Sequence, residues 1–166
     1  MQDFILKELS LDDALIFALH ANNYNVWINL TDRFPHPYTE EHAKDFIKMT
    51  LLPAPIEVKG IYIGDEPIGA IGLHPMDDVF RNNIELGYWI AEPYWGKGIM
   101  TKAIQQMVDY AFANFEVNRI FARPFGRNIG SIKVLEKCGF ILEATLSQTV
   151  VKDGKLEDEL IYAIRR

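Results

Sequence analysis

The chain has 166 residues, of which 49% are hydrophobic, 12% aromatic and 24% charged, the size and composition of one ordinary globular domain over residues 1–166. Its net charge of −6, with no basic run longer than Arg165-Arg166, argues against nucleic-acid binding. An acidic surface would instead attract a cationic amine or a basic protein.

Cysteine content and hydropathy point to the interior of the cell. The single cysteine, Cys138, cannot form a disulfide within the chain, which suits a reducing compartment. The first residues lack the basic and apolar regions of a signal peptide. No stretch approaches the ~18 apolar residues of a membrane span. We therefore expect a cytoplasmic protein with no membrane partner.

The chain begins with a strand-like run and a helix-start signal. Residues 4–9 are apolar enough for a short strand. Ser10, followed by Asp12 and Asp13, is a helix N-cap signature that predicts a helix to about His20. Its expected buried face consists of Leu11, Leu15, Ala18 and Leu19.

A loop and a second helix are expected next. Residues 22–38 are rich in asparagine and proline, which favours a loop. Thr39 is a second N-cap candidate, and Pro53 and Pro55 are expected to end the helix that it opens. The residues spaced for burial in this helix are Ala43, Phe46, Ile47 and Leu51.

Three strand-like runs follow, at residues 57–64, 67–75 and 83–91. The first two flank Asp65-Glu66, which we expect to form a hairpin turn. The third run mixes isoleucine, tyrosine and tryptophan, a composition that favours strand.

The segment after the third run is the clearest helix of the sequence. Its apolar residues recur every three or four positions and so form one continuous stripe. The stripe consists of Met100, Ala103, Ile104, Met107, Val108, Ala111, Phe112 and Phe115.

The remaining elements are a strand, a short helix and a hairpin. Residues 118–125 are typical of a strand, and a helix is expected at about 129–138. Two last strands, near 140–151 and 156–164, flank Asp153-Gly154, a pair that favours a hairpin turn.

The order of elements predicts an α/β (α+β) fold rather than a fully parallel doubly wound sheet. The predicted order is not a repeated βαβ pattern. It runs strand, two helices, three strands, helix, strand, helix and two strands. A mixed sheet of about seven strands, mostly antiparallel and with helices on both faces, fits this order better.

The stretch EPYWGKGIM, residues 92–100, places two glycines between a strand and an amphipathic helix. A helix N-terminus carries unpaired N–H donors and a partial positive charge, and Gly96 and Gly98 would let a phosphate approach those donors. A glycine-assisted turn without a ligand explains the same two residues. The loop lacks the Gly-Lys-Ser/Thr ending of a P-loop, and Thr101 stands where a dinucleotide fingerprint has its third glycine.

Two longer blocks carry a family resemblance. IELGYWIAEPYWGKGIMTKAI (84–104) and NIGSIKVLEKCGFILEATL (128–146) resemble the GNAT superfamily of acetyl-CoA-dependent N-acetyltransferases. The chain looks most like the branch of ribosomal-protein N-terminal and spermidine acetyltransferases, and NLTDRFPHPYTEEHAKDFI (29–47) is also similar to that branch. The resemblance implies a sheet that splays apart between its fourth and fifth strands.

The resemblance implies that acetyl-CoA is the co-substrate and that no metal takes part. Backbone amides of the glycine loop would hold the pyrophosphate, while backbone groups at the end of the preceding strand would pair with pantetheine. Pro93 replaces the glutamine or arginine that usually begins the loop. Asn128 matches a cofactor-contacting position and is equally a helix N-cap candidate. The implied cofactor-binding residues are Trp89, Ile90, Ala91, Trp95, Gly96, Lys97, Gly98, Ile99, Met100, Thr101 and Asn128.

The implied reaction is attack of a neutral amine on a thioester. Glu85 is the candidate base, because a carboxylate in an otherwise apolar strand would have a raised pKa; a salt-bridge role is the alternative. The resemblance implies the N–H of Ile90 as donor to the oxyanion. Ser131 matches the serine that the ribosomal branch places beside the sulfur, and is equally an ordinary first-turn helix serine.

Two departures from the family pattern favour an alternative, a catalytically silent acyl-CoA-binding domain. Leu135 occupies the position where many members carry a proton-donating tyrosine. Thr149, Val150 and Val151 occupy a strand region that can carry a glutamate. A nucleotide-phosphate protein that uses the glycine loop is a third reading.

The acceptor would be a small amine or a protein N-terminus, and the branch is compatible with a homodimer. The four histidines lack ligand-like spacing, so no metal site is expected. Aromatic residues are the candidates for the acceptor pocket, with sheet packing as the alternative for the strand residue. They are Trp27, Phe34, Tyr38 and Tyr88.

Overall fold

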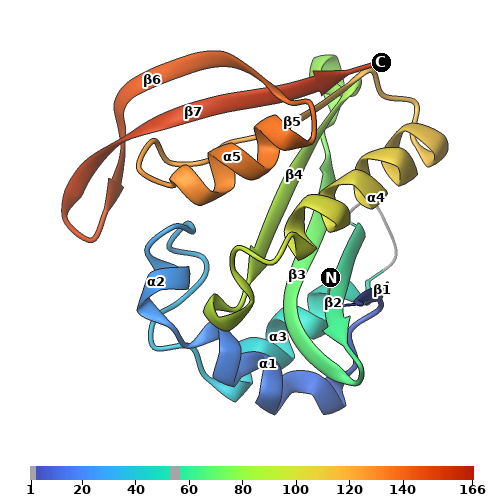
Figure 1. The fold of residues 1–166 in the computed structure, drawn as a ribbon, viewed down its shortest axis with the longest axis vertical. Helices are drawn as coiled ribbons and strands as arrows, with labels where there is room; N and C mark the ends of the chain where they lie inside the picture. Colours follow the sequence, from blue (N-terminus) through green and yellow to red (C-terminus); the bar gives the residue numbers. More distant parts are fainter. Residues whose placement is uncertain (1–2, 53–56) are drawn as a thin grey trace. The chain divides into compact units, whose positions relative to one another are not determined.

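The computed structural model of the protein describes residues 3–52 and 57–166, and Figure 1 shows its helices and strands. In chain order they are β1 (Ile5–Lys7), η1 (Leu11–Asp13), α1 (Ala14–Ala21), α2 (Tyr24–Trp27), α3 (Glu40–Thr50), β2 (Glu57–Ile63), β3 (Glu66–Pro75), η2 (Asp78–Phe80), β4 (Asn83–Ile90), η3 (Glu92–Tyr94), α4 (Ile99–Asn114), β5 (Arg119–Ala122), α5 (Ile129–Lys137), β6 (Ile141–Lys152) and β7 (Lys155–Arg165).

The predicted helices and strands are all present, with small differences at their ends. The expected loop at 22–38 contains one helical turn, α2, which Asn23 caps through its side chain. The first hairpin turn lies at Gly64-Asp65, one residue earlier than predicted, because Gly64 adopts a left-handed φ of 58°. Pro53 and Pro55, expected to end α3, lie outside the described residues.

The strands form one mixed sheet in the order β1-β2-β3-β4-β5-β7-β6. β4 and β5 are parallel, and α4 lies in the chain connection between them, as a parallel pair requires. The pairs β1–β2, β5–β7 and β6–β7 are antiparallel. This arrangement confirms the predicted fold class.

The chain divides into two compact units, residues 1–72 with 88–99, and residues 73–87 with 100–166. In the first unit, α1 and α3 lie side by side (Figure 1). Its core gathers Phe17, Ile47, Tyr62 and Trp89, with Phe34 and Phe46 packed against it. The aromatic rings of Phe17 and Trp89 meet edge to face, 4.9 Å between centroids.

The buried face of α1 differs from the predicted one. Of the predicted face, Ala18 is buried, whereas Leu11 is exposed, Leu15 is 54% exposed and Leu19 is 66% exposed. The other buried residues of α1 are Ala14, Phe17 and Ala21. The capping box of Ser10 and Asp13 closes the 3₁₀ turn η1, and the α-helix proper starts only at Ala14. Three alanines allow α1 to pack closely against α3, with Phe17 as the one large side chain directed inward.

The helices of the second unit follow the predicted pattern. Six residues of the predicted stripe on α4 are buried, namely Met100, Ala103, Ile104, Met107, Val108 and Ala111. α5 ends at Lys137, and Gly139 follows with a left-handed φ of 86°. Leu135, on α5, is fully buried.

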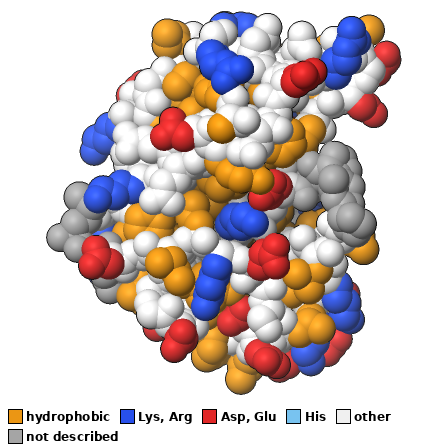
Figure 2. All heavy atoms as spheres, turned by 90° about the vertical axis from the view of Figure 1, so that its right-hand side faces the viewer, with side chains coloured by type: hydrophobic (Ala, Val, Ile, Leu, Met, Phe, Trp, Pro, Cys, Tyr) orange, Lys and Arg blue, Asp and Glu red, His pale blue; other side chains and the backbone are white. Residues whose placement is uncertain are grey.

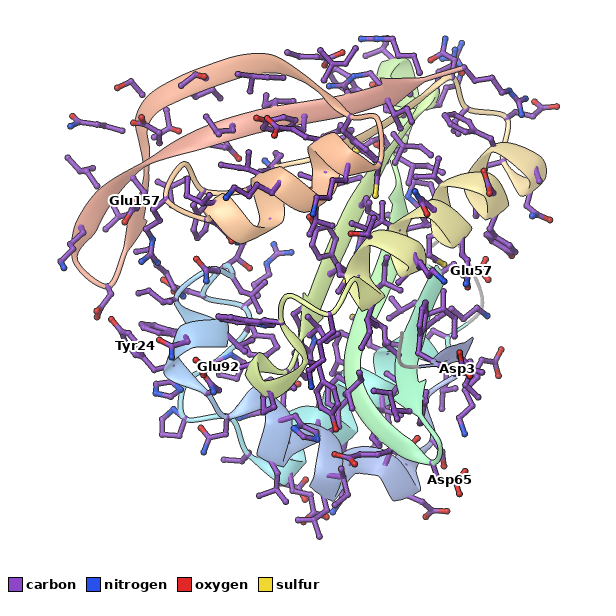
Figure 3. The ribbon with its side chains drawn as sticks, in the orientation of Figure 1. Asp3, Tyr24, Glu57, Asp65, Glu92 and Glu157 are labelled. Carbon is purple, nitrogen blue, oxygen red and sulfur yellow. The ribbon has the colours of Figure 1, made fainter. Side chains whose placement is uncertain are left out.

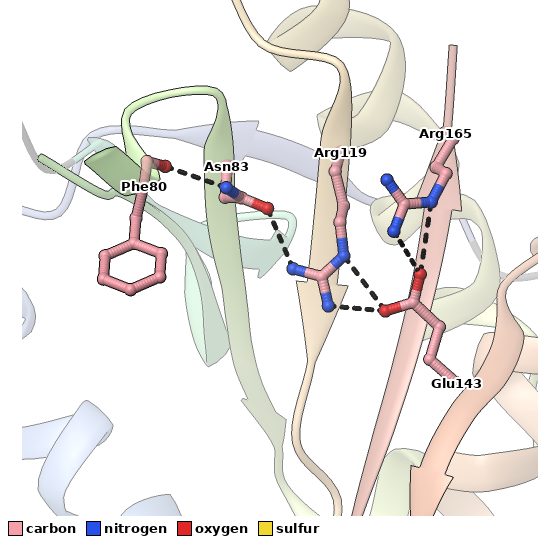
Figure 4. Close-up of polar contacts among 5 residues, drawn as sticks. All are labelled: Phe80, Asn83, Arg119, Glu143 and Arg165. Atoms are coloured by element: carbon pink, nitrogen blue, oxygen red, sulfur yellow. Dashed lines mark hydrogen bonds and ion pairs between the residues drawn. The ribbon is translucent and has the colours of Figure 1, made fainter. Parts of the chain in front are cut away.

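A polar cluster joins four strands of the second unit (Figure 4). Glu143 on β6 accepts hydrogen bonds of 2.6 Å from both Arg119 on β5 and Arg165 on β7. Arg119 also donates to Asn83 on β4 at 2.9 Å. The hydrogen bonds from Arg119, and then those from Arg165, lower the pKa of the Glu143 carboxyl.

The face shown in Figure 2 carries Lys and Arg side chains interspersed with Asp and Glu. No large patch of basic side chains alone is visible on the described part of that face.

Candidate active site

Along β4, the backbone N–H and C=O groups of successive residues point alternately toward β3 and toward the opposite side. The N–H of Met76 donates to the carbonyl of Asn83 at 3.0 Å, and the N–H of Ala91 donates to Ile68 at 2.8 Å. Odd-numbered residues of β4 therefore direct their backbone groups toward β3. Ile90 directs its N–H and carbonyl to the opposite side.

The ladder between β4 and β5 is short. Its register runs from Asn83 opposite Arg119 to Glu85 opposite Phe121, whereas β4 itself continues to Ile90. Of the three residues predicted to pair with pantetheine, Ala91 already donates its N–H to β3. Ile90 is the residue whose N–H faces away from β3.

The glycine loop of the first unit has the backbone that its sequence suggests. Gly96 and Gly98 have left-handed φ angles of 72° and 78°, and α4 begins at Ile99 directly after them. A Cβ built on either glycine would meet no other atom within 4 Å. The loop is therefore open at both positions, and the first N–H groups of a 16-residue helix follow it.

The side chains around the glycines hold the loop to the end of β4. The indole Nε1–H of Trp95 donates to the carbonyl of Ile90 at 2.8 Å. The ammonium of Lys97 lies 5.1 Å from the ring centroid of Tyr94, a cation–π contact. In this conformation the charge of Lys97 is paired with an aromatic face, a role that the sequence did not predict.

The candidates on α5 meet through a helix cap. The side-chain oxygen of Asn128 accepts the N–H of Ser131 at 3.1 Å, which makes Asn128 the N-cap of α5. Both residues are half-buried, in the second unit together with Met100 and Thr101. The carbonyl of Thr101 in turn accepts a 3.3 Å hydrogen bond from the thiol of Cys138. Burial raises the pKa of that thiol.

Glu85 takes part in an ion-pair row on the sheet of the second unit. Its carboxylate accepts from Nε of Arg123 at 2.9 Å and from Nη2 of Arg123 at 3.4 Å. Arg123 also lies 3.4 Å from Glu159 on β7. The salt-bridge alternative for Glu85 is thus present in the structure, and its role as a base stays a prediction.

His74 is a residue of this region that the sequence reading missed. It lies on β3, half-buried, and its Nε2 would be 3.6 Å from a Cβ built on Gly87. Burial lowers the pKa of His74, while the charge of Glu85 acts in the opposite direction. Only the β3–β4 register could have revealed this neighbourhood.

The predicted acceptor residues fall into different environments of the first unit. Tyr38 is only 5% exposed, and its ring centroid lies 4.6 Å from that of Phe34 in the core. Burial raises the pKa of Tyr38 to about 12. Trp27 and Tyr88 are half-buried. Of the four predicted residues, Phe34 and Tyr38 belong to the packing of the first unit.

The half-buried Trp27 belongs to an aromatic cluster that also contains Tyr24 and His36. The rings of Trp27 and His36 are stacked at 5.3 Å, and Tyr24 lies 5.6 Å from Trp27 and 6.1 Å from His36. Tyr24 and His36, which the sequence reading did not select, are exposed.

Glu92 lies beside this cluster. Its two oxygens accept from the side-chain amides of Asn23 at 2.8 Å and Asn25 at 2.9 Å, the two residues that flank Tyr24 (Figure 3). The hydrogen bond from Asn23, and then that from Asn25, lower the pKa of Glu92, which keeps it ionised. A carboxylate and three aromatic faces are thus grouped at α2.

Residues 3–52 and 57–166 contain no group of three or more His, Cys, Asp or Glu side chains arranged to hold a metal ion. Within the same ranges, no helix combines the length and the apolar character that crossing a membrane requires.

Relatives and solved structures are similar to this chain. The "Probable N-acetyltransferase YjcK" of Bacillus subtilis (strain 168) is 38% identical over 100 residues, which are 60% of this chain and 55% of that protein. The "Ribosomal-protein-serine acetyltransferase" of Escherichia coli (strain K12) is 30% identical over 122 residues, 74% of this chain and 63% of that protein. The chain thus spans between about half and two thirds of the length of these relatives.

A solved structure agrees in fold. The microcin C7 self immunity acetyltransferase MccE, in complex with acetyl-CoA and AMP, superposes with a TM-score of 0.86. The sequences are 20% identical, and the superposition covers 100% of this chain and 94% of the other.

The family itself follows from the sequence match. The family described as "Acetyltransferase (GNAT) domain" matches residues 3–141. This match confirms the resemblance and the enzyme class at the level of the family, and the Escherichia coli relative supports the ribosomal-protein branch. The chain therefore belongs to the GNAT acetyltransferase family.

Proposed function

We propose that this chain is an N-acetyltransferase that moves the acetyl group of acetyl-CoA directly to a primary amine, on a small molecule or a protein N-terminus. The observation that carries the proposal is the pair of left-handed glycines, Gly96 and Gly98, directly before α4 in a chain of the GNAT family. The match of residues 3–141 runs through both compact units, which supports one acyltransferase domain over 1–166.

The residues present fit an acyl-CoA donor. Backbone amides from Trp95 to Thr101 would hold the pyrophosphate, because a helix N-terminus favours anions and the two glycines leave the loop open. The N–H of Ile90, directed away from β3, would serve pantetheine or the acetyl oxygen. Asn128 would add a side-chain amide, since its oxygen already caps α5 and its Nδ2 is the group left to donate.

Acetyl-CoA, when bound, supplies an activated thioester. An alkyl ammonium has a pKa near ~10, so it must lose a proton before its nitrogen can attack. Glu85 is the carboxylate on the proton-accepting side, acting directly or through a neighbouring group. Ser131 would donate a hydrogen bond to the sulfur as the carbon–sulfur bond breaks, and the thiolate finally takes up a proton.

The aromatic cluster at α2 indicates the class of acceptor. Glu92 is held as a carboxylate by the amides of Asn23 and Asn25, the two residues that flank Tyr24, and the ring of Tyr24 lies 5.6 Å from that of Trp27. Carboxylates and aromatic faces both attract alkyl ammonium groups. We therefore propose a cationic amine as acceptor, with Trp27 as the predicted pocket residue that this cluster contains.

A catalytically silent acyl-CoA-binding domain is the second candidate. It is favoured by the ion pair that engages Glu85 with Arg123 and by the burial of Leu135 where many relatives carry a tyrosine. Under this reading the protein binds acetyl-CoA and releases no free thiol with any amine.

Thiol release from acetyl-CoA, measured with a panel of polyamines, monoamines and basic peptide N-termini, separates the two candidates. The proposal expects amine-dependent release and a tenfold or greater loss in Glu85→Gln. Tight acetyl-CoA binding by calorimetry without release for any acceptor would favour the silent domain instead.

The composition of the chain bears on its compartment and partners. We propose that it acts in the cytoplasm without nucleic-acid or membrane partners, which the acidic composition and the single cysteine support. A homodimer stays a prediction, and light scattering of the purified protein measures it.

A further inference from the structure

His74 and Glu85 lie opposite each other in the β3–β4 ladder. Two hydrogen bonds, Met76 to Asn83 and Ala91 to Ile68, fix the same antiparallel register at the two ends of the ladder. In that register residue 74 faces residue 85, and directly opposed residues project from the same face of a sheet. Both residues belong to the second unit.

The ring of His74 is directed along β4 and away from Asn83. Its Nε2 and Cδ2 would lie 3.6 Å and 3.9 Å from a Cβ built on Gly87, two residues beyond Glu85. At these distances a Cβ at position 87 would be in ordinary van der Waals contact with the imidazole edge, which places the ring beside Gly87. Nε2 therefore lies beside position 87 of β4 rather than beside position 83.

Glu85 and His74 differ in their charged partners. Glu85 is engaged by two hydrogen bonds from Arg123, and Arg123 continues to Glu159. The guanidinium of Arg123 is therefore the cationic partner of the Glu85 carboxylate. His74 faces Glu85 on β4, and the next charges are Arg123, directly after β5, and Glu159 on β7.

Burial favours the neutral imidazole, since it lowers the pKa of His74. A neutral imidazole offers one ring nitrogen as a proton acceptor. The carboxylate of Glu85 stabilises the imidazolium once it forms, because opposite charges at short range favour the charged state.

We propose that His74 accepts the proton of the attacking amine, with Glu85 as the partner that stabilises the resulting imidazolium. The inference rests on the proposed transferase function. The amine N–H bond breaks and the proton passes to the imidazole, directly or through one water, while the nitrogen–carbon bond forms and the carbon–sulfur bond breaks. The imidazolium then returns its proton to solvent or to the thiolate.

Variants of His74 test this role, with His42→Gln as the matched control. His42 occupies the N3 position of the capping box of α3, where glutamine serves equally well. We expect His74→Gln to lower kcat/KM roughly 10²–10⁴-fold at neutral pH and to remove the acid limb of its pH profile. Acetyl-CoA affinity, measured by calorimetry, should stay within about twofold, and His42→Gln should behave as the wild type. Added imidazole should restore part of the activity of His74→Ala, a second variant that keeps the test open if His74→Gln folds poorly.

Two outcomes would overturn the inference in distinguishable ways. If His74→Gln keeps its acid limb and activity within about threefold while Glu85→Gln loses both, Glu85 is the base alone and the transferase function stands. If the wild type binds acetyl-CoA but acetylates no amine, the proposed function fails, and the role of His74 fails with it.

Discussion

Gly98→Ala and Gly154→Ala form a matched pair that isolates the contribution of the glycine loop. The two glycines have left-handed φ angles of 78° and 70°, and a Cβ built on either meets nothing within 4 Å. Holding alanine in this region costs about 1–2 kcal/mol at either site. For a chain of this size we expect each variant to lose roughly 2–8 °C in Tm.

Only Gly98→Ala should weaken acetyl-CoA binding. Gly154 lies in the turn between β6 and β7, whereas Gly98 directly precedes the first N–H groups of α4. A shift of the loop that removes one charge-assisted hydrogen bond costs about 1.5–3 kcal/mol. That loss corresponds to a roughly 10- to 150-fold higher Kd, which titration calorimetry measures directly. Equal Kd values for the two variants would refute the assignment of the loop to the pyrophosphate.

Two further predictions concern stability. Glu143→Ala removes the partner of Arg119 and Arg165 and should cost about 1–2 kcal/mol in urea unfolding at neutral pH. The folded-state pKa of Glu143 is lowered, so its contribution to the free energy of unfolding is fully present above the unfolded-state pKa. That contribution is lost as the pH falls through the folded-state pKa. If the difference in unfolding free energy between wild type and variant does not shrink on acidification, this sign is contradicted. Tyr62→Phe removes a 2.5 Å hydrogen bond from a fully buried phenol to Asp13 and should lower the unfolding free energy by about 1–2 kcal/mol, whereas an unchanged urea midpoint would show that the bond contributes nothing net.

Long periodic segments of this sequence were predictable because their local pattern and their tertiary role coincide. The stripe on α4 is continuous over sixteen residues, and six of its members are buried as expected. The Asp153-Gly154 turn was equally predictable, since both residues adopt the left-handed φ that the pair favours.

The short first helix shows where local pattern fails. Leu11, Leu15 and Leu19 have helical spacing, yet α1 packs through Phe17 and its alanines. Close contact between helices favours small side chains at the interface, and leucine spacing alone does not report that contact.

The backbone of the glycine loop was predictable from the sequence, and the cross-strand neighbours of the candidate site were not. The left-handed φ angles of Gly96 and Gly98 are a property of their own backbone, which a sequence motif can report. His74 and Glu92 depend on partners that are distant in sequence, Glu85 on the next strand and Asn23 before α2. The segment between β3 and β4 contains the 3₁₀ turn η2, so no simple hairpin rule predicts that residue 74 faces residue 85.

Acetylation of an amine, followed by mass spectrometry, tests the central claim most directly. The purified chain is incubated with acetyl-CoA and an equimolar mixture of cationic and neutral amines, and the products are identified by mass. We predict N-acetylated product from the cationic amines and an equal amount of free coenzyme A. At subsaturating acetyl-CoA, the variant Gly98→Ala should lose nearly all of this product formation. Acetyl-CoA that binds and stays intact in the presence of every amine would contradict the claim.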